Sequence, residues 1–217
     1  METKDYRNTK YCPVLEQVGR KKRLLEEKIK KDSPKTTILY NKVRLRQGIY
    51  HKEFAKIYNE KCAYCGCMWG ILPTESFEVD HFVNEAAYPN TKEGRAEAGR
   101  MENLVWSCFT CNRGKHDMLI EPPYDMILNV DNGNIAKVFV RDEDYSIKIE
   151  DTYKNDKFVL SFYKALHLEY EARRLDYLAL KLQGKYKNEA DPARKQKLGE
   201  ALYLLIEKRN TFVEGRK

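Results

Sequence analysis

Two cysteine pairs with the same spacing constrain this chain more than any other feature. Cys62-Ala-Tyr-Cys65 and Cys108-Phe-Thr-Cys111 are both CxxC pairs, separated by residues 66–107. Each pair can place two thiolates on one tight turn, and two such turns supply the four ligands of a closed tetrahedral zinc site. A closed site has no open position for a substrate. We therefore predict a structural Zn²⁺ that fastens two distant segments of the chain.

The remaining cysteines leave one choice open. Cys67 extends the first pair to CxxCxC, so either Cys65 or Cys67 can be its second ligand, and we favour Cys65. Cys12 stands alone and is predicted to be a small buried hydrophobic residue.

Composition narrows the class of protein. The 217 residues include 40 Lys and Arg against 33 Asp and Glu, a net charge of +7, and 42% are hydrophobic, enough to build a core. No apolar run approaches the roughly 20 residues of a membrane span, and the polar N-terminus resembles no secretory signal. We expect a cytoplasmic protein without a membrane partner, in which cysteines stay reduced and free to bind metal. The mild positive charge permits a polyanionic partner without requiring one.

Four regions follow one another along the chain. We predict an N-terminal helical arm over residues 1–60, with Val18, Leu25 and Ile29 on one face, and a core over 61–120. The basic run within the arm is either a solvated helix face or a surface that meets phosphates.

The second half of the chain changes its hydrophobic period. Residues 121–156 alternate as a β-hairpin or meander would, with Asn132-Gly133 as the expected turn. Residues 157–217 return to a helical period, and Asp191-Pro192 is expected to open the last helix. We interpret these helices as scaffold, with partner binding as the alternative.

The segment between the cysteine pairs carries polar residues in a suggestive order. Asp80-His81 ends a stretch from Phe77 that alternates like a strand, and Asn103 opens a second apparent strand. Because neighbouring strand residues point to opposite sides, Asp80 and His81 need a bend or a strand end to serve one reaction centre. Asn112 follows the second cysteine pair at an expected helix start.

Taken together, these motifs resemble the HNH nucleases, which have the ββα-metal fold. The family's Asp-His, Asn-Leu and Cys-x-x-Cys-Asn-x-x-Lys motifs occur here in order as VDHF, ENLVWSC and CFTCNRGK, between about Lys61 and His116. The resemblance implies an α+β chain. Its ββα-metal core, with a four-cysteine structural zinc, would be flanked by N- and C-terminal α-helices and a short β-hairpin.

The resemblance also implies roles for single residues. His81 matches the general base that takes a proton from water, while Asp80 and Asn112 match the ligands of one divalent cation. Asn103 matches the residue that pins the loop between the strands, and Lys115 matches a basic residue near the phosphate.

One further ligand and three arginines are less specific. His116, four residues after Asn112, is either a third ligand, as in some relatives, or a surface residue at the rim. Arg95, Arg100 and Arg113 lie near the motif and are candidates for contact with the phosphate backbone.

Elementary chemistry separates the two metal roles. Oxygen donors such as Asp80 and Asn112 suit Mg²⁺ or Mn²⁺, whereas thiolates suit zinc. A histidine with an ordinary pKa of about 6.5 is a usable base at neutral pH. One ion with a histidine base is therefore the simplest mechanism.

These observations favour a metal-dependent endonuclease acting on double-stranded DNA. Proteins with an HNH core and helical extensions are frequent in bacterial anti-phage systems such as Septu, beside an ATPase, so an ATPase partner and a defence role are expectations from the resemblance. Two alternatives remain: a non-catalytic zinc-dependent module that binds nucleic acid or protein, and a nuclease directed at RNA, including tRNA.

Overall fold

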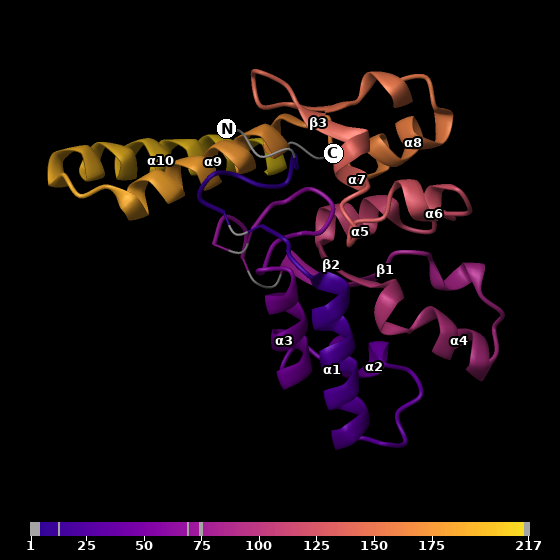
Figure 1. Ribbon diagram of the computed structural model, residues 1–217. Helices are drawn as coiled ribbons and strands as arrows, with labels where there is room; N and C mark the ends of the chain where they lie inside the picture. The colour runs from indigo at the N-terminus through magenta and orange to yellow at the C-terminus, as the bar shows by residue number, and fades with distance from the viewer. Residues whose placement is uncertain (1–4, 13, 69, 74–75, 215–217) are drawn as a thin grey trace.

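The computed structural model describes residues 5–12, 14–68, 70–73 and 76–214, with helices gathered around two short sheets (Figure 1). The helices before the central sheet are α1 (Val18–Asp32), α2 (Tyr40–Val43) and α3 (Ile49–Ile57). Those after it are α6 (Tyr124–Ile127), α7 (Ile135–Val138), α8 (Lys157–Ala165), α9 (Glu171–Asn188) and α10 (Pro192–Glu214).

At the centre lies a ββα unit. Strand β1 (Phe77–His81) pairs antiparallel with β2 (Leu104–Cys108), with Phe77 opposite Cys108 and His81 opposite Leu104. Helix α5 (Phe109–Lys115) follows β2 without a loop and contacts both strands. The predicted α+β class and its ββα core are confirmed.

The segment that joins the two strands is more ordered than a plain loop. It contains the short turns η2 (Glu85–Ala87) and η3 (Met101–Asn103) on either side of helix α4 (Lys92–Ala98). Thr91 caps α4, because its hydroxyl accepts a hydrogen bond of 3.0 Å from the backbone N–H of Gly94.

Alternation along β1 decides which face each residue takes. Phe77 and Val79 are buried, and the Phe77 ring stacks on Trp106 of β2 at a centroid distance of 5.9 Å. Glu78 and Asp80 belong to the other face, on which side chains of α5 meet them. The strand thus separates an apolar layer from a polar one.

The N-terminal arm packs by the face that the sequence predicts. Val18, Leu25 and Ile29 of α1 are buried, and α1 lies against α3. Residues of α1 and α3 join those of β2 and α8 in one hydrophobic core. The arm is therefore part of the wall behind the central sheet.

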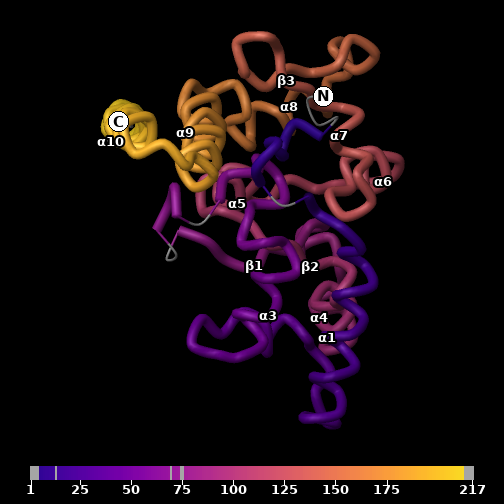
Figure 2. Tube along the Cα trace, turned by 60° about the vertical axis from the view of Figure 1, so that its left-hand side comes forward, coloured from indigo at the N-terminus to yellow at the C-terminus, as the bar shows by residue number. Residues whose placement is uncertain are grey.

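The C-terminal helices form an antiparallel pair that extends to one side of the molecule (Figures 1 and 2). The backbone N–H of Arg194 donates to the Asp191 carboxylate at 2.7 Å, so Asp191 caps α10 as predicted. Helix α10 packs chiefly on α9 and leaves Tyr203 and Leu204 exposed.

The predicted hairpin exists, but its turn lies further along the chain than Asn132-Gly133. Strands β3 (Phe139–Arg141) and β4 (Ile147–Ile149) pair antiparallel around a turn at residues 142–146. Asn132-Gly133 instead lies between the helices α6 and α7, and residues 126–130 form no strand. Asn side chains account for this local geometry, since the Asn129 carboxamide accepts from the backbone of Asp131 at 3.0 Å and Asn132 at 3.2 Å.

Candidate metal centre and hydrolytic site

The four cysteines of the two CxxC pairs meet in the interior. The Sγ atoms of Cys62, Cys65, Cys108 and Cys111 all lie within 4.8 Å of one another, and all four residues are buried. Cys65 Sγ and Cys108 Sγ are 3.8 Å apart, the spacing expected between sulfurs in a tetrahedron with Zn–S bonds of about 2.3 Å. The quartet fits a zinc ion, which it can hold as a structural centre.

Local backbone geometry selects the ligands. The N–H of Cys62 donates to the carbonyl of Cys67 at 2.8 Å and closes the first turn, in which Gly66 has a φ of 76°. A Cβ on Gly66 would lie 2.6 Å from the Arg7 carbonyl oxygen, so the turn requires glycine. Cys67 is buried but outside the quartet, which leaves Cys65 as the second ligand. Cys12 is buried as predicted.

Asp80 is buried beside the Cys62–Cys65 turn. Its Oδ2 accepts a hydrogen bond of 2.7 Å from the Tyr64 hydroxyl, and its Oδ1 lies 3.3 Å from Lys115 Nζ. Burial raises the pKa of Asp80 to about 6, although the Lys115 ammonium and the Tyr64 hydroxyl oppose the shift. Tyr64 lies between Cys62 and Cys65 in the sequence, so the cysteine turn directly orients this carboxylate.

His81 occupies the end of β1 on the opposite face. It is half-buried, and its ring lies 4.3 Å from that of Tyr40 in α2. Burial lowers the pKa of His81 to about 4, and the nearby Lys115 charge acts in the same direction. At neutral pH the imidazole is therefore uncharged, as a general base must be, but it is a weaker base than the histidine of ordinary pKa that the sequence led us to expect.

Asn112 meets a carboxylate that sequence reasoning missed. Its Nδ2 donates to Glu78 Oε1 at 2.8 Å. Glu78 precedes Asp80 by two residues, so the strand period that separates Asp80 from His81 places Glu78 on the Asp80 face. That alternation is the signal from which Glu78 could have been found.

Glu78 and Asn112 open onto a surface hollow of about 330 Å³. The hollow is lined by Glu78, Asn84, Asn112, Arg113, His116 and Asp117. Carboxylate and amide oxygens dominate this lining, and such hard donors suit Mg²⁺ or Mn²⁺. Among the described residues, the cysteines are the one group of three or more acidic, imidazole or thiolate ligands gathered within metal-binding distance.

Asn103 joins the two ends of the segment between the strands. Its Oδ1 accepts from the N–H of Val83 at 2.8 Å, and its Nδ2 donates to the carbonyls of Val83 at 2.9 Å and Ala98 at 2.8 Å. These bonds hold the residues that follow His81 in place.

The burial of Lys115 contradicts its predicted place near the phosphate. Its side chain is 1% exposed, and its ammonium donates to the carbonyl of His81 at 2.8 Å besides its contact with Asp80. A phosphate has no access to this ammonium. Lys115 instead fastens α5 to the end of β1 and balances a buried carboxylate.

The other predicted residues divide between the hollow and α4. His116 lines the hollow, but α5 ends before it, and its φ of 42° removes it from helical spacing. Arg95 contacts Asn90 at 3.2 Å, and Arg100 pairs with Glu97 at 2.9 Å, so both belong to the surface of the α4 segment. Arg113 alone of the three predicted arginines lines the hollow.

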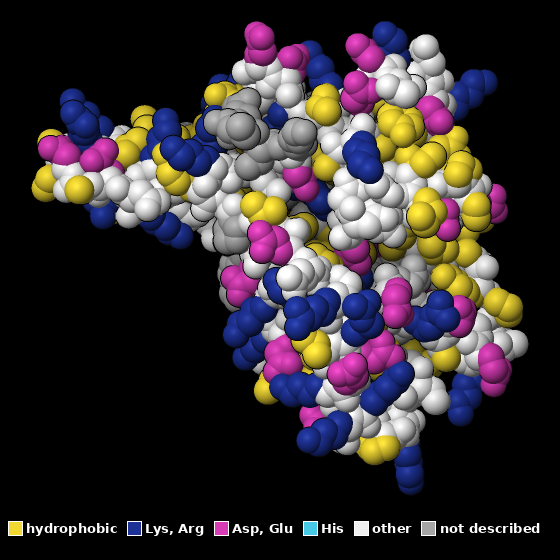
Figure 3. Space-filling model, in the orientation of Figure 1, with side chains coloured by type: hydrophobic (Ala, Val, Ile, Leu, Met, Phe, Trp, Pro, Cys, Tyr) yellow, Lys and Arg dark blue, Asp and Glu magenta, His cyan; other side chains and the backbone are white. Residues whose placement is uncertain are grey.

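Residues of the N-terminal arm reach the same surface. The guanidinium carbons of Arg46 and Arg113 each lie 5.1 Å from the centre of the Phe109 ring, and Arg44 lies 5.6 Å from the centre of the Tyr40 ring. Elsewhere, Lys and Arg mix with Asp and Glu over the lower helices in Figure 3. Net charge is accordingly a weaker guide to this surface than the arrangement of a few arginines.

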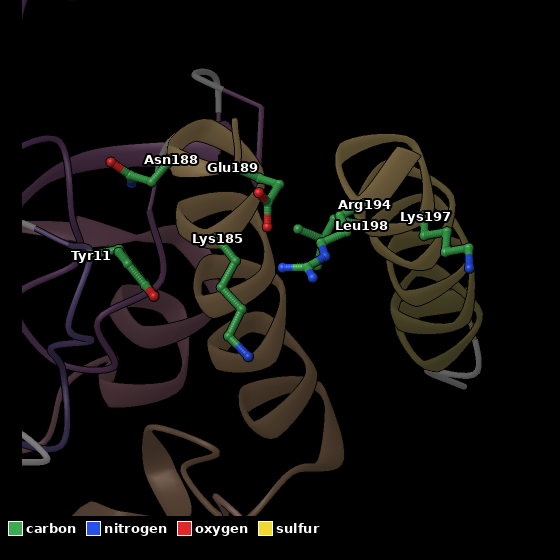
Figure 4. Close-up of a pocket in the computed structure, with 7 residues that line it drawn as sticks. All are labelled: Tyr11, Lys185, Asn188, Glu189, Arg194, Lys197 and Leu198. Atoms are coloured by element: carbon green, nitrogen blue, oxygen red, sulfur yellow. The ribbon is translucent and has the colours of Figure 1, made fainter. Parts of the chain in front are cut away.

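A larger hollow of about 510 Å³ lies at the α9–α10 turn, away from these residues (Figure 4). Its lining includes Tyr11, Lys185, Glu189, Arg194 and Lys197. Among the described residues, it is lined by no imidazole and by no residue of β1 or α5, so the smaller hollow beside β1 is the candidate reactive site.

An antiparallel strand pair that runs into a helix, with thiolates on one side and Asp, Asn and His groups around the strand end, defines a ββα metal-binding domain. Residues 62–118 match the HNH endonuclease family, and the chain therefore carries an HNH endonuclease domain. Such a domain supports a nuclease-type function and implies nucleic-acid binding. No curated protein and no solved structure matches the chain. In the described part, no helix has the length and apolar character needed to cross a bilayer.

Proposed function

We propose that the chain is a metal-dependent endonuclease that hydrolyses phosphodiester bonds of DNA. The observation that carries the proposal is the meeting of Glu78 and Asn112 at an open hollow beside the strand that ends in Asp80-His81. The HNH match over residues 62–118 independently supports phosphodiester chemistry.

Oxygen donors at the strand end would hold the catalytic cation, Mg²⁺ or Mn²⁺. Asn112, which lines the hollow, and Asp80, which is buried beside Lys115 and does not line it, are the proposed ligands, and His116 at the rim is a further candidate. Because Glu78 holds Asn112 through its Nδ2, the Asn112 oxygen remains available to a cation. When bound, such a cation neutralises the negative charge that develops on the phosphate and on the leaving oxygen.

His81 is the proposed general base. Its uncharged imidazole at neutral pH takes a proton from the attacking water, and the Tyr40 ring limits how the imidazole can turn. Lys115 and Asn103 are positioning residues, because Lys115 binds the His81 carbonyl and Asn103 binds the backbone of Val83, two residues further on.

Arg46 and Arg113 are the proposed contacts with the phosphate backbone. Both guanidinium groups are exposed, and their shared stacking on Phe109 limits their motion. Arg95 and Arg100 contact Asn90 and Glu97 on the α4 segment and do not belong to this proposed set. An ATPase partner and a role in anti-phage defence stay predictions from the family resemblance.

A cleavage assay tests the proposal. Plasmid DNA, single-stranded DNA and tRNA are incubated with Mg²⁺ or Mn²⁺ and with wild type, His81→Ala or His116→Ala. We expect DNA cleavage that His81→Ala lowers by about 10²- to 10⁴-fold, the usual contribution of a general base, with bound zinc unchanged. A smaller loss in His116→Ala at low cation concentration would support its role as a ligand.

Other outcomes would replace the proposal with a named alternative. Equal cleavage by wild type and His81→Ala would refute the catalytic assignment. Nucleic-acid binding without cleavage under either ion would indicate a non-catalytic binding module. Cleavage confined to tRNA would indicate an RNA-directed nuclease.

A further inference from the structure

A buried arginine from the C-terminal helices touches the cysteine quartet. Arg173 of α9 lies 3.3 Å from both Cys65 Sγ and Cys111 Sγ and 3.9 Å from Cys108 Sγ through its guanidinium nitrogens. The residue is 4% exposed. It thus contacts three of the four proposed zinc ligands, from a position more than a hundred residues along the chain from Cys65.

The charge of a four-thiolate zinc site explains this contact. Four thiolates around one Zn²⁺ leave an excess of negative charge in the interior, where an unpaired charge is costly. The guanidinium presents several N–H donors in a rigid fork, and here that fork reaches sulfurs from both CxxC pairs. Arg173 also donates to the Leu166 carbonyl at 3.1 Å, which fixes its head group independently of the sulfurs.

The contact continues from the sulfurs into the last helix. Arg173 lies 3.9 Å from Asp176 Oδ2, and Asp176 Oδ1 accepts a hydrogen bond of 2.7 Å from Arg209 of α10. All three side chains are buried. Alternating charges therefore link the quartet through α9 to α10.

We propose that Arg173 couples zinc binding to the docking of the α9–α10 pair. In this arrangement the metal-bound thiolates hold the guanidinium, and the guanidinium stabilises the bound zinc. By thermodynamic reciprocity, removing either partner weakens the hold on the other. The coupling concerns the structural centre, and it stands or falls independently of the nuclease activity.

Zinc retention is the first test. Zinc-loaded chains of all 217 residues are challenged with a chromogenic chelator, and the apparent zinc affinity is measured for wild type, Arg173→Met, Arg173→Lys and Arg174→Met. Arg174 is the matched control, because it neighbours Arg173 on α9 and pairs with Glu171 at 2.9 Å at the surface. We expect about a 10- to 100-fold loss of affinity in Arg173→Met, as for other outer contacts of metal ligands, and a smaller loss in Arg173→Lys. Affinity equal to that of Arg174→Met would overturn the proposal.

Hydrogen exchange tests the other direction of the coupling. In zinc-loaded Arg173→Lys, amides of α9 and α10 should exchange faster than in wild type, while those of α1 keep their wild-type rates. A uniform change along the chain, or none, would contradict a specific link. If Arg173→Met does not fold, Arg209→Met replaces it, and its zinc affinity should fall below that of Arg174→Met. Affinity equal to the control would refute the link through Asp176.

Discussion

The cysteine quartet and the hollow beside β1 share one short element, α5, but differ in exposure and in donor chemistry. Cys111 and Asn112 are neighbours on α5, yet Cys111 is fully buried among thiolates while Asn112 lines an open surface. Thiolates close the first site, and oxygen donors leave the second accessible. A closed centre, connected through Tyr64 to the buried Asp80, thus lies next to a hollow that stays open to solvent.

Breaking the closed site should produce the largest effect. Cys108→Ser removes one zinc ligand, and structural zinc contributes about 10–16 kcal/mol in small zinc domains, as much as the whole stability of a typical protein. We expect loss of bound zinc by elemental analysis and no cooperative thermal transition.

Cys67→Ser is the matched control for this loss, because Cys67 is equally buried but outside the quartet. It should keep its zinc and lose about 1–3 kcal/mol of stability, the cost of burying a hydroxyl. Stoichiometric zinc in Cys108→Ser, or its loss in Cys67→Ser, would overturn the ligand assignment.

Removing a contact in the hollow should lower the rate of cleavage without unfolding the protein. Glu78→Ala removes the acceptor that orients Asn112, and we expect cleavage to fall about 10- to 100-fold, with a higher requirement for the divalent cation. Glu78→Gln keeps an acceptor oxygen and should recover much of this loss. Kinetics at varied Mg²⁺, with bound zinc measured in parallel, check both variants.

Asp117→Ala separates orientation from charge. Asp117 is an exposed acid in the same hollow and pairs with His116 at 2.8 Å, whereas the side chain of Asn112 hydrogen-bonds to Glu78. A loss in Asp117→Ala equal to that in Glu78→Ala would mean that the charge of the hollow, or the contact that holds His116, is responsible rather than the position of Asn112.

The two sites also differ in how much of them the sequence predicts. The quartet follows from local spacing, since each CxxC turn places its own two sulfurs. The contact of Arg173 with the quartet could not be predicted from the sequence. The helical period of α9 indicates that Arg173 faces inward, but it does not indicate which residues Arg173 contacts in three dimensions. Lys115 was predicted at a phosphate because a family motif gives residue type and order, whereas its burial depends on how α5 packs on β1.

Rules that consider only neighbouring residues also explain where the predicted fold differs from the structure. Asn-Gly favours a hairpin turn, yet Asn132-Gly133 joins two short helices because the strands that a turn needs form only after Val138. Alternation in β1 puts Asp80 and His81 on opposite faces of the strand, and the same rule puts Glu78 on the Asp80 face. The buried positions of α1 could be predicted, because Val18, Leu25 and Ile29 recur at helical spacing and all pack into the same hydrophobic core.

Substitutions of the arginines at the rim of the hollow should have a smaller effect than those of Glu78, and the effect should be on duplex binding. Arg46→Gln and Arg113→Gln each remove one guanidinium from Phe109, and we expect each to weaken duplex binding severalfold and to lower the salt dependence by about one phosphate contact. Binding of a labelled duplex by His81→Ala chains, titrated with salt, checks this. Arg100→Gln is the control, because Arg100 pairs with Glu97 on the α4 segment. An equal loss in Arg100→Gln would indicate diffuse attraction rather than two defined contacts.

The smallest expected effect is a change in the pH dependence of stability at His51, in the N-terminal helices that pack behind the central sheet. His51 of α3 is buried, its Nδ1 lies 2.7 Å from the Val43 carbonyl oxygen, and its ring packs edge-on against Trp106 of β2. Burial lowers the pKa of His51 from its ordinary value of about 6.5, so below that pH the unfolded chain binds more protons than the folded one. This contribution to stability is complete above about pH 6.5 and is lost as the pH falls towards the folded pKa. His51→Gln removes the titration, so the difference in unfolding free energy between wild type and variant should shrink in that direction. A difference that stays constant between pH 7.5 and about 5 would show that His51 keeps its ordinary pKa, and that the wall behind the two sites adds nothing to their response to acid.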